Sequence, residues 1–96
     1  MSILHLVSFK YKGWVDEAQR GEHRARLRSL HELDGVTSLK VGADLVHSPR
    51  SYDTGLSVTF IDRAALDAYQ IDPRHVPIAQ FGLSLSEHIV SVDFEI

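Results

Sequence analysis

Hydrophobic and polar residues alternate along four stretches of the chain, the pattern of strands that turn one face toward a hydrophobic core. The first predicted strand runs from about Ile3 to Tyr11 and carries apolar residues on both of its faces. The apolar positions of the other three are Leu39, Val41, Ala43 and Leu45, then Leu56, Val58 and Phe60, and last Val90, Val92, Phe94 and Ile96. Because the apolar register of the last strand is unbroken, we expect it to fill an interior position of the sheet.

Helical spacing separates these strands. A first helix is predicted from about Asp16 to Leu33, with His23 one turn before the apolar stripe of Leu27, Leu30 and Leu33. Asp62 is the predicted N-cap of a second helix that carries Ala65, Leu66 and Tyr69 on one side. Pro73 ends that helix, and Asp72-Pro73 also signals a short third helix that carries His75 and fades near Gly82, kept brief by Pro77.

This order of elements predicts an α+β fold of the split βαβ type, a single domain over residues 1–96. Its four-stranded antiparallel sheet has helices on one face only. We assign to the other face a set of small or apolar side chains with few charges, Leu4, Leu6, Ser8, Ser57, Thr59 and Ser91. Pairing that face with a second copy would bury Leu4 and Leu6, so we predict a homodimer joined sheet to sheet.

Composition narrows the function classes. The 96 residues are 44 % hydrophobic and 24 % charged, which argues against disorder, and no apolar run reaches membrane-spanning length. The absence of cysteine excludes disulfides and thiolate chemistry. With a net charge of −3 and scattered basic residues, the chain has no basic patch of the kind that binds nucleic acid. The first residues lack the features of a signal peptide, so we expect a cytoplasmic protein with neither nucleic-acid nor membrane partners.

The candidate chemistry centres on a phenol and two imidazoles. Tyr69 and His75 lie at either end of the proline turn, and His5 interrupts the apolar face of the first strand. Burying such groups unpaired costs about 1 to 3 kcal/mol each, so the helix–sheet layer should pair them or hold a wet pocket. We predict His75 as the base, Tyr69 as its hydrogen-bonding partner and His5 as an orienting residue, with ligand-binding residues His23, Leu27, Val7 and Phe9.

Each of these residues also has a purely structural interpretation. The structural interpretation of His5 is a core histidine bonded to a carbonyl or to Tyr69, and that of His75 is a residue that shapes the turn. His23 is interpreted as a helix residue whose ring snorkels past Leu27. No two histidines lie one helical turn apart, and spacing alone places no carboxylate beside His5 or His75, so we predict neither a metal site nor a cofactor. We assign no role to His31, His47 and His88.

Several motifs in order resemble the stress-responsive dimeric α/β barrel (Dabb) family. They are His5-x-Val7-x-Phe9-Lys10, Gly42, Tyr52-Asp53 with Leu56 and Phe60, Tyr69 to His75, and Val92-Asp93-Phe94-Glu95. The resemblance implies a ferredoxin-like fold and tight dimers in which two sheets close into a barrel. A plant polyketide cyclase of this family, which forms olivetolic acid, closes its substrate by aldol condensation with a tyrosine and a histidine. These correspond to Tyr69 and His75 here, and its first-strand histidine corresponds to His5.

The chain departs from the family pattern at two places. Asp72 stands before the proline where a histidine is frequent, and His23 and Leu27 replace bulky aromatic residues of the cyclase cavity. The first interpretation is therefore a homodimer that binds a small carbonyl-bearing or aromatic molecule, with possible cyclase-like or isomerase-like acid/base activity. The alternatives are a non-enzymatic stress-associated dimer with structural histidines and a dimeric-barrel monooxygenase, for which Trp14 is the only support.

Overall fold

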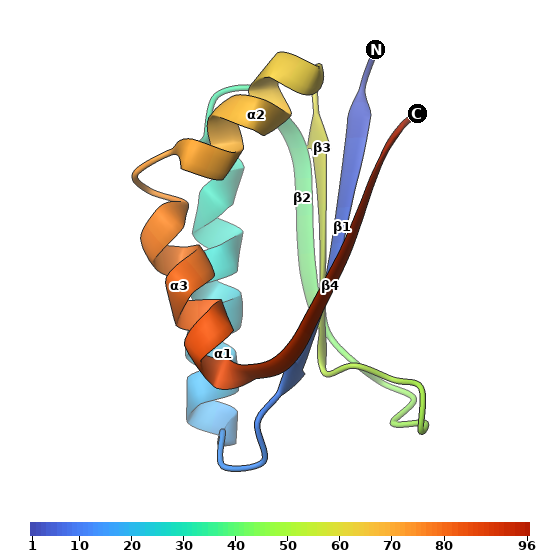
Figure 1. Cartoon of the computed structure of the whole chain (residues 1–96), viewed down its shortest axis with the longest axis vertical. Helices are drawn as coiled ribbons and strands as arrows, with labels where there is room; N and C mark the ends of the chain where they lie inside the picture. Colours follow the sequence, from blue (N-terminus) through green and yellow to red (C-terminus); the bar gives the residue numbers. More distant parts are fainter.

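A computed structural model describes all residues, 1–96, as a sheet covered on one side by helices (Figure 1). The elements follow one another as β1 (Ile3–Tyr11), α1 (Glu17–Arg28), a 3-10 turn (Ser29–Glu32), β2 (Val36–Ala43), β3 (Thr54–Phe60), α2 (Arg63–Ile71), α3 (Val76–Leu85) and β4 (Ser86–Glu95). The four strands are antiparallel in the order β2-β3-β1-β4. The predicted ferredoxin-like α+β fold is confirmed. No helix is both long and apolar enough to cross a membrane.

Aspartate side chains cap the first two helices. The Asp16 carboxylate accepts a hydrogen bond from the Gln19 backbone N–H at 2.8 Å, and the Gln19 side chain accepts one from the Asp16 N–H. Asp62 accepts from the Ala65 N–H at 2.9 Å and caps α2 as predicted. α1 ends at Arg28, earlier than the predicted Leu33, because the chain tightens there into the 3-10 turn that brings Leu30 into the core.

α3 begins and ends later in the chain than the sequence pattern predicted, so His75 precedes the helix as its N-cap and is not carried on it. It begins after His75 and continues past Gly82 to Leu85. Pro77 does not shorten it, since proline falls in the first turn, where the missing N–H has no partner to lose. α3 covers the lower half of the sheet, beside α1 (Figure 1).

The predicted interior position of the last strand is wrong. β4 pairs only with β1 and forms an edge of the sheet. Its apolar residues Val90, Val92 and Phe94 face away from the helices and are 44 to 54 % exposed, because they share a face with Leu4, Leu6 and Ser8 of β1. Ser91 therefore lies on the helix-facing side and not on the open face. Leu45, predicted to be buried in the second strand, follows the end of β2 and is 89 % exposed.

The core fills the space between β1, β3 and the helices. Odd-numbered residues of β1 point into it, and Val58 and Phe60 of β3 are wholly buried beside Leu30. No comparable layer covers β4, whose residues after Ser86 are all exposed. The helix-facing side of β4 therefore borders a space that side chains do not fill.

A close contact between Gly35 and α2 sets the position of that helix. Gly35 has a φ of +83°, and a Cβ at this position would lie 2.5 Å from the Cβ of Ala65. Its carbonyl accepts a hydrogen bond from the Ile61 N–H at 2.9 Å. The residue just before β2 thus has to be glycine for α2, which carries Tyr69, to pack where it does.

We predict that Gly35→Ala destabilises the fold by about 2 kcal/mol or more, through the strained φ and the clash with Ala65. Gly21→Ala is the matched control, since Gly21 lies in α1 with open space around its Cβ position. It should stabilise the protein by about 0.5 to 1 kcal/mol. Urea unfolding of both variants measures the two effects, and equal shifts would contradict the role assigned to Gly35.

Candidate functional site

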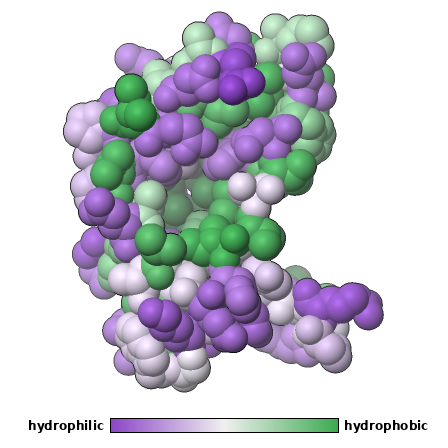
Figure 2. All heavy atoms as spheres, in the orientation of Figure 1, coloured by the Kyte–Doolittle hydropathy of each residue, from purple (hydrophilic) through white to green (hydrophobic).

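A cavity of about 210 Å³ lies between the sheet and the helices. It is lined by all seven residues predicted for the site, namely His5, Val7, Phe9, His23, Leu27, Tyr69 and His75. Seven further residues complete the wall: Leu56, Gln70, Ile78, Ala79, Ile89, Ser91 and Asp93. Figure 2 shows a hollow near the centre of the face that looks onto β4, bordered by hydrophilic residues above and hydrophobic residues below. This cavity is larger than one of about 150 Å³ that is known to bind benzene.

His5 is held by a carboxylate that sequence reasoning missed. Asp93 is its direct cross-strand neighbour on β4, and the imidazole Nδ1 bonds the Asp93 carboxylate. An ionised carboxylate only accepts, so Nδ1 carries the proton in this hydrogen bond. Residue spacing alone had not placed this carboxylate beside His5. Alternation along β4 places Asp93 on one face of that strand. The sequence does not show that this face meets the helices.

Tyr69 lies between the two other candidate groups. Its ring centroid is 5.8 Å from that of His5 and 4.1 Å from that of His75, and its edge packs on Phe60 at 5.0 Å. Burial raises the pKa of the phenol, so the hydroxyl stays protonated at neutral pH. The buried hydroxyl has no hydrogen-bond partner within the protein. It is a donor without an acceptor in the wall of a cavity.

His75 is positioned by the turn between α2 and α3. The Asp72 carboxylate accepts a hydrogen bond from the Arg74 N–H at 2.7 Å, which closes the turn and leaves His75 half-buried at the start of α3. Burial lowers the pKa of the imidazole, against opposing effects of the Gln70 backbone and the Asp72 charge, with His5 also lowering it. Its buried Nδ1 has no partner within the protein. His75 is thus a neutral imidazole beside the Tyr69 phenol.

His23 forms the opposite end of the cavity wall. It is wholly buried and does not snorkel to the surface, which corrects that interpretation. Its Nδ1 is 2.7 Å from the Tyr11 hydroxyl, which donates to Thr54 at 2.9 Å. The ring packs on Phe9 at 4.7 Å and fills the space left by Gly82, where a Cβ would lie 2.7 Å from Nε2. Burial first, and then the charges of two nearby arginines, lower the pKa of His23 to about 4.

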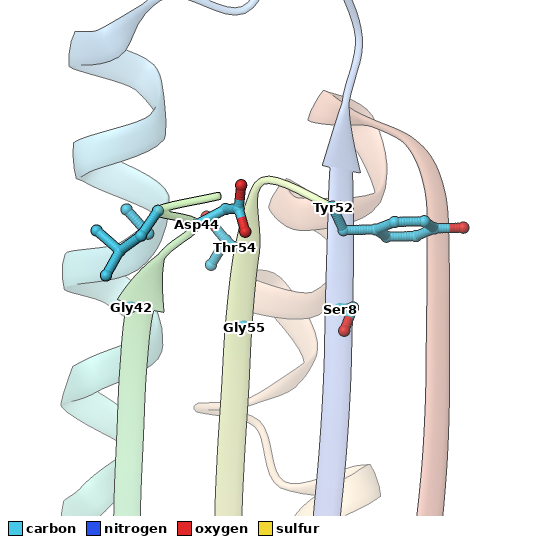
Figure 3. Close-up of a pocket in the computed structure, with 8 residues that line it drawn as sticks. Ser8, Gly42, Asp44, Tyr52, Thr54 and Gly55 are labelled. Carbon is cyan, nitrogen blue, oxygen red and sulfur yellow. The ribbon is translucent and has the colours of Figure 1, made fainter. Parts of the chain in front are cut away.

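The remaining candidates lie outside this cavity. His31, His47 and His88 have side chains 63 to 78 % exposed, and Trp14 is 61 % exposed in the turn before α1. No three His, Asp or Glu side chains converge on a point that could hold a metal ion. A separate depression of about 420 Å³ lies on the open face of the sheet, where Tyr52 extends across β1 above Ser8 (Figure 3). It contains no histidine, so the candidate acid/base residues line only the cavity on the helix side of the sheet.

The lowered pKa of His23 predicts a pH-dependent stability. Unfolded His23 titrates near 6.5 and folded His23 near 4, so between these values the unfolded chain binds more protons. The contribution of His23 is complete above pH 6.5 and is lost as the pH falls toward 4, by up to about 3 kcal/mol. Urea unfolding at pH 7 and pH 4 measures it. His23→Gln should lose less stability over this range than wild type, and an equal loss would contradict the assignment.

Known structures share this fold over the whole chain. A dimeric ferredoxin-like protein of unknown function from Thermobifida fusca has a TM-score of 0.92 at 23 % identity and covers 100 % of this chain and 92 % of its own. One from Jannaschia scores 0.85 at 29 % identity, with full coverage of both chains. Hydroxynitrile lyase from Passiflora edulis scores 0.89 at 20 % identity, with 99 and 93 % coverage.

A comparison with curated proteins finds no match. The family model of the stress responsive A/B barrel domain, Dabb, matches residues 3–96. This match covers nearly the whole sequence and agrees with the resemblance carried by its motifs. The chain belongs to the stress-responsive A/B barrel domain family.

Proposed function

We propose that this protein is a homodimer that binds a small carbonyl-bearing or aromatic molecule in the cavity between sheet and helices and acts on it by acid/base chemistry. The observation that carries the proposal is the meeting of His5, Tyr69 and His75 in one cavity wall. Buried polar atoms are nearly always hydrogen-bonded in folded proteins. The unpartnered Tyr69 hydroxyl and His75 Nδ1 are therefore candidates for groups that a ligand satisfies.

The ionisation states of these groups suit enolisation of a carbonyl compound. A neutral His75 has a lone pair with which to take a proton from the carbon next to the carbonyl. The electrons of the broken C–H bond move onto the carbonyl oxygen, and the protonated Tyr69 hydroxyl donates a hydrogen bond to the resulting enolate. The enolate then regains a proton or attacks a second carbonyl. His5, fixed by Asp93, orients the Tyr69 ring and the substrate.

Structural likeness supports an enzyme only indirectly. The Passiflora edulis protein of the same fold is described as a hydroxynitrile lyase, an enzyme name, but at 20 % identity that likeness concerns the fold. The competing proposal is a non-enzymatic stress-associated dimer with structural histidines. The deep burial of Tyr69 and His5 favours it, since both side chains also contribute to the core.

The open face of the sheet supports the dimer. Val90, Val92 and Phe94 lie beside Leu4 and Leu6 of β1, and the three β4 side chains are 44 to 54 % exposed. Contiguous exposed apolar patches mark interaction surfaces in soluble proteins. Two of the similar structures are described as dimeric ferredoxin-like proteins. We propose that the two sheets face one another across a two-fold axis.

Hydrogen–deuterium exchange at the methyl group of acetophenone in D₂O, followed by proton NMR, tests the chemistry. Wild type should accelerate the exchange, and His75→Ala should reduce the acceleration by about 100-fold or more, since general base catalysis typically contributes that much. Tyr69→Phe should reduce it through loss of the hydrogen bond to the enolate. His88→Ala removes an exposed imidazole outside the cavity and should change nothing. If wild type does not accelerate exchange while His75→Ala lowers the melting temperature, the structural alternative is correct.

Sedimentation at micromolar concentration tests the assembly. Val92→Glu places a charge between Val90 and Phe94 in the apolar patch of the open face and should convert the dimer to a folded monomer. Ile71→Glu is the matched control, because Ile71 is an exposed apolar residue at the end of α2 and lies in the helix layer. A wild-type monomer, or a Val92→Glu dimer, would contradict the sheet-to-sheet arrangement.

A further inference from the structure

The wall of the cavity contains no lysine and no arginine. Of its fourteen residues, eight are hydrophobic and three are histidines, and Asp93 is the one carboxylate. Asp93 is already bonded to His5. A carboxylate ligand entering this space would leave water without gaining a cation to pair with. It would also approach the negative charge of Asp93.

Neither His23 nor His75 supplies the missing positive charge. His23 is wholly buried, and its pKa of about 4 keeps it neutral at physiological pH. Burial lowers the pKa of His75 as well. Their unpartnered nitrogen atoms suit hydrogen bonds with uncharged groups, not ion pairs with an anion.

A second space, nearer the surface, likewise has more carboxylates than free cations in its lining. A cleft of about 590 Å³ between α2 and β4 shares Gln70 and Asp93 with the cavity, so these two residues lie where the two spaces adjoin. Asp67 and Glu95 add two more carboxylates to its lining, and Arg63 is its one cation. The Arg63 guanidinium donates to Asp67 at 3.0 Å, so its charge is already paired.

We propose that the cavity discriminates by charge, accepting uncharged or cationic ligands and rejecting carboxylates of the same shape. This inference rests on the proposed function and specifies its substrate class as ketones, aldehydes, esters or amides, with free acids excluded. An acid produced in the cavity would be released, because the same lining that rejects an acid substrate also disfavours an acid product.

Three isosteric probes test the inference. Benzamide is neutral, benzoate anionic and benzamidine cationic, while the ring and the size of its substituent stay nearly constant. Titration of the protein followed by ¹⁵N–¹H NMR, read at the backbone amides of Ala79 and Ser91 in the cavity wall, reports binding at this site. We expect benzamide and benzamidine to bind at least about tenfold more tightly than benzoate, a difference of about 1.4 kcal/mol.

A single added cation should narrow the preference. Gln70→Lys places an ammonium at the junction of the cavity and the cleft and should strengthen benzoate binding by about fivefold while weakening benzamidine. Glu17→Gln is the control, because it changes the net charge by the same amount at an exposed site at the start of α1. It should leave all three affinities unchanged, and 0.5 M salt should reduce the effect of Gln70→Lys.

The outcomes separate this inference from the proposed function. If benzamide and benzoate bind with equal affinity at the cavity amides, the discrimination by charge is wrong and the binding function stands. If benzoate binds more tightly than benzamide, the discrimination has the opposite sign and the inference is overturned. If none of the three shifts the cavity amides at millimolar concentration, the proposed ligand-binding function fails, and the charge selectivity fails with it.

Discussion

The alternation of side chains along β1 is the constraint on which the rest of the structure depends. β1 pairs with β3 on one side and β4 on the other, so its register assigns the residues of three strands to two faces. His5, Val7 and Phe9 look toward the helices and line the cavity, while Leu4, Leu6 and Ser8 look the other way. A slip of one residue would exchange the two sets and would destroy both the cavity and the apolar open face.

The cavity exists because the helices cover the sheet unevenly. α1 contacts β2 and α2 contacts β3, where Val58 and Phe60 are fully buried, whereas β4 forms an edge of the sheet and its residues after Ser86 are exposed. The polar groups of the site lie at this border, whereas Tyr11, His23 and Thr54 deeper in the core bond one another. At the border, Asp93 reaches His5 from the uncovered strand and Tyr69 reaches it from α2. The edge position of β4 is therefore a condition for the site.

The periodicity of the sequence predicted most of this arrangement, because strand alternation and helical spacing depend only on residues that are near one another in the chain. His5 lies on the core face of β1 by alternation, Tyr69 lies on the core face of α2 by helical spacing, and Pro73 forces the turn that brings back His75. Asp93 was missed for a different reason. Alternation shows that β4 has two faces, but not which one meets the helices, and the apolar face was assigned to the core. Only the register with β1 identifies Asp93 as the partner of His5.

That assignment failed because the core was treated as the only place that buries apolar side chains. Val90, Val92 and Phe94 are exposed in a single chain, so the strand carries one apolar face that a second sheet can cover and one polar face that lines the cavity. β4 therefore takes part both in the proposed dimer interface and in the wall of the cavity. A partner that packs on Val92 restrains the residues on either side of it, Ser91 and Asp93, and so restrains the carboxylate that orients His5. An uncovered edge strand held by β1 alone would leave that orientation less well defined.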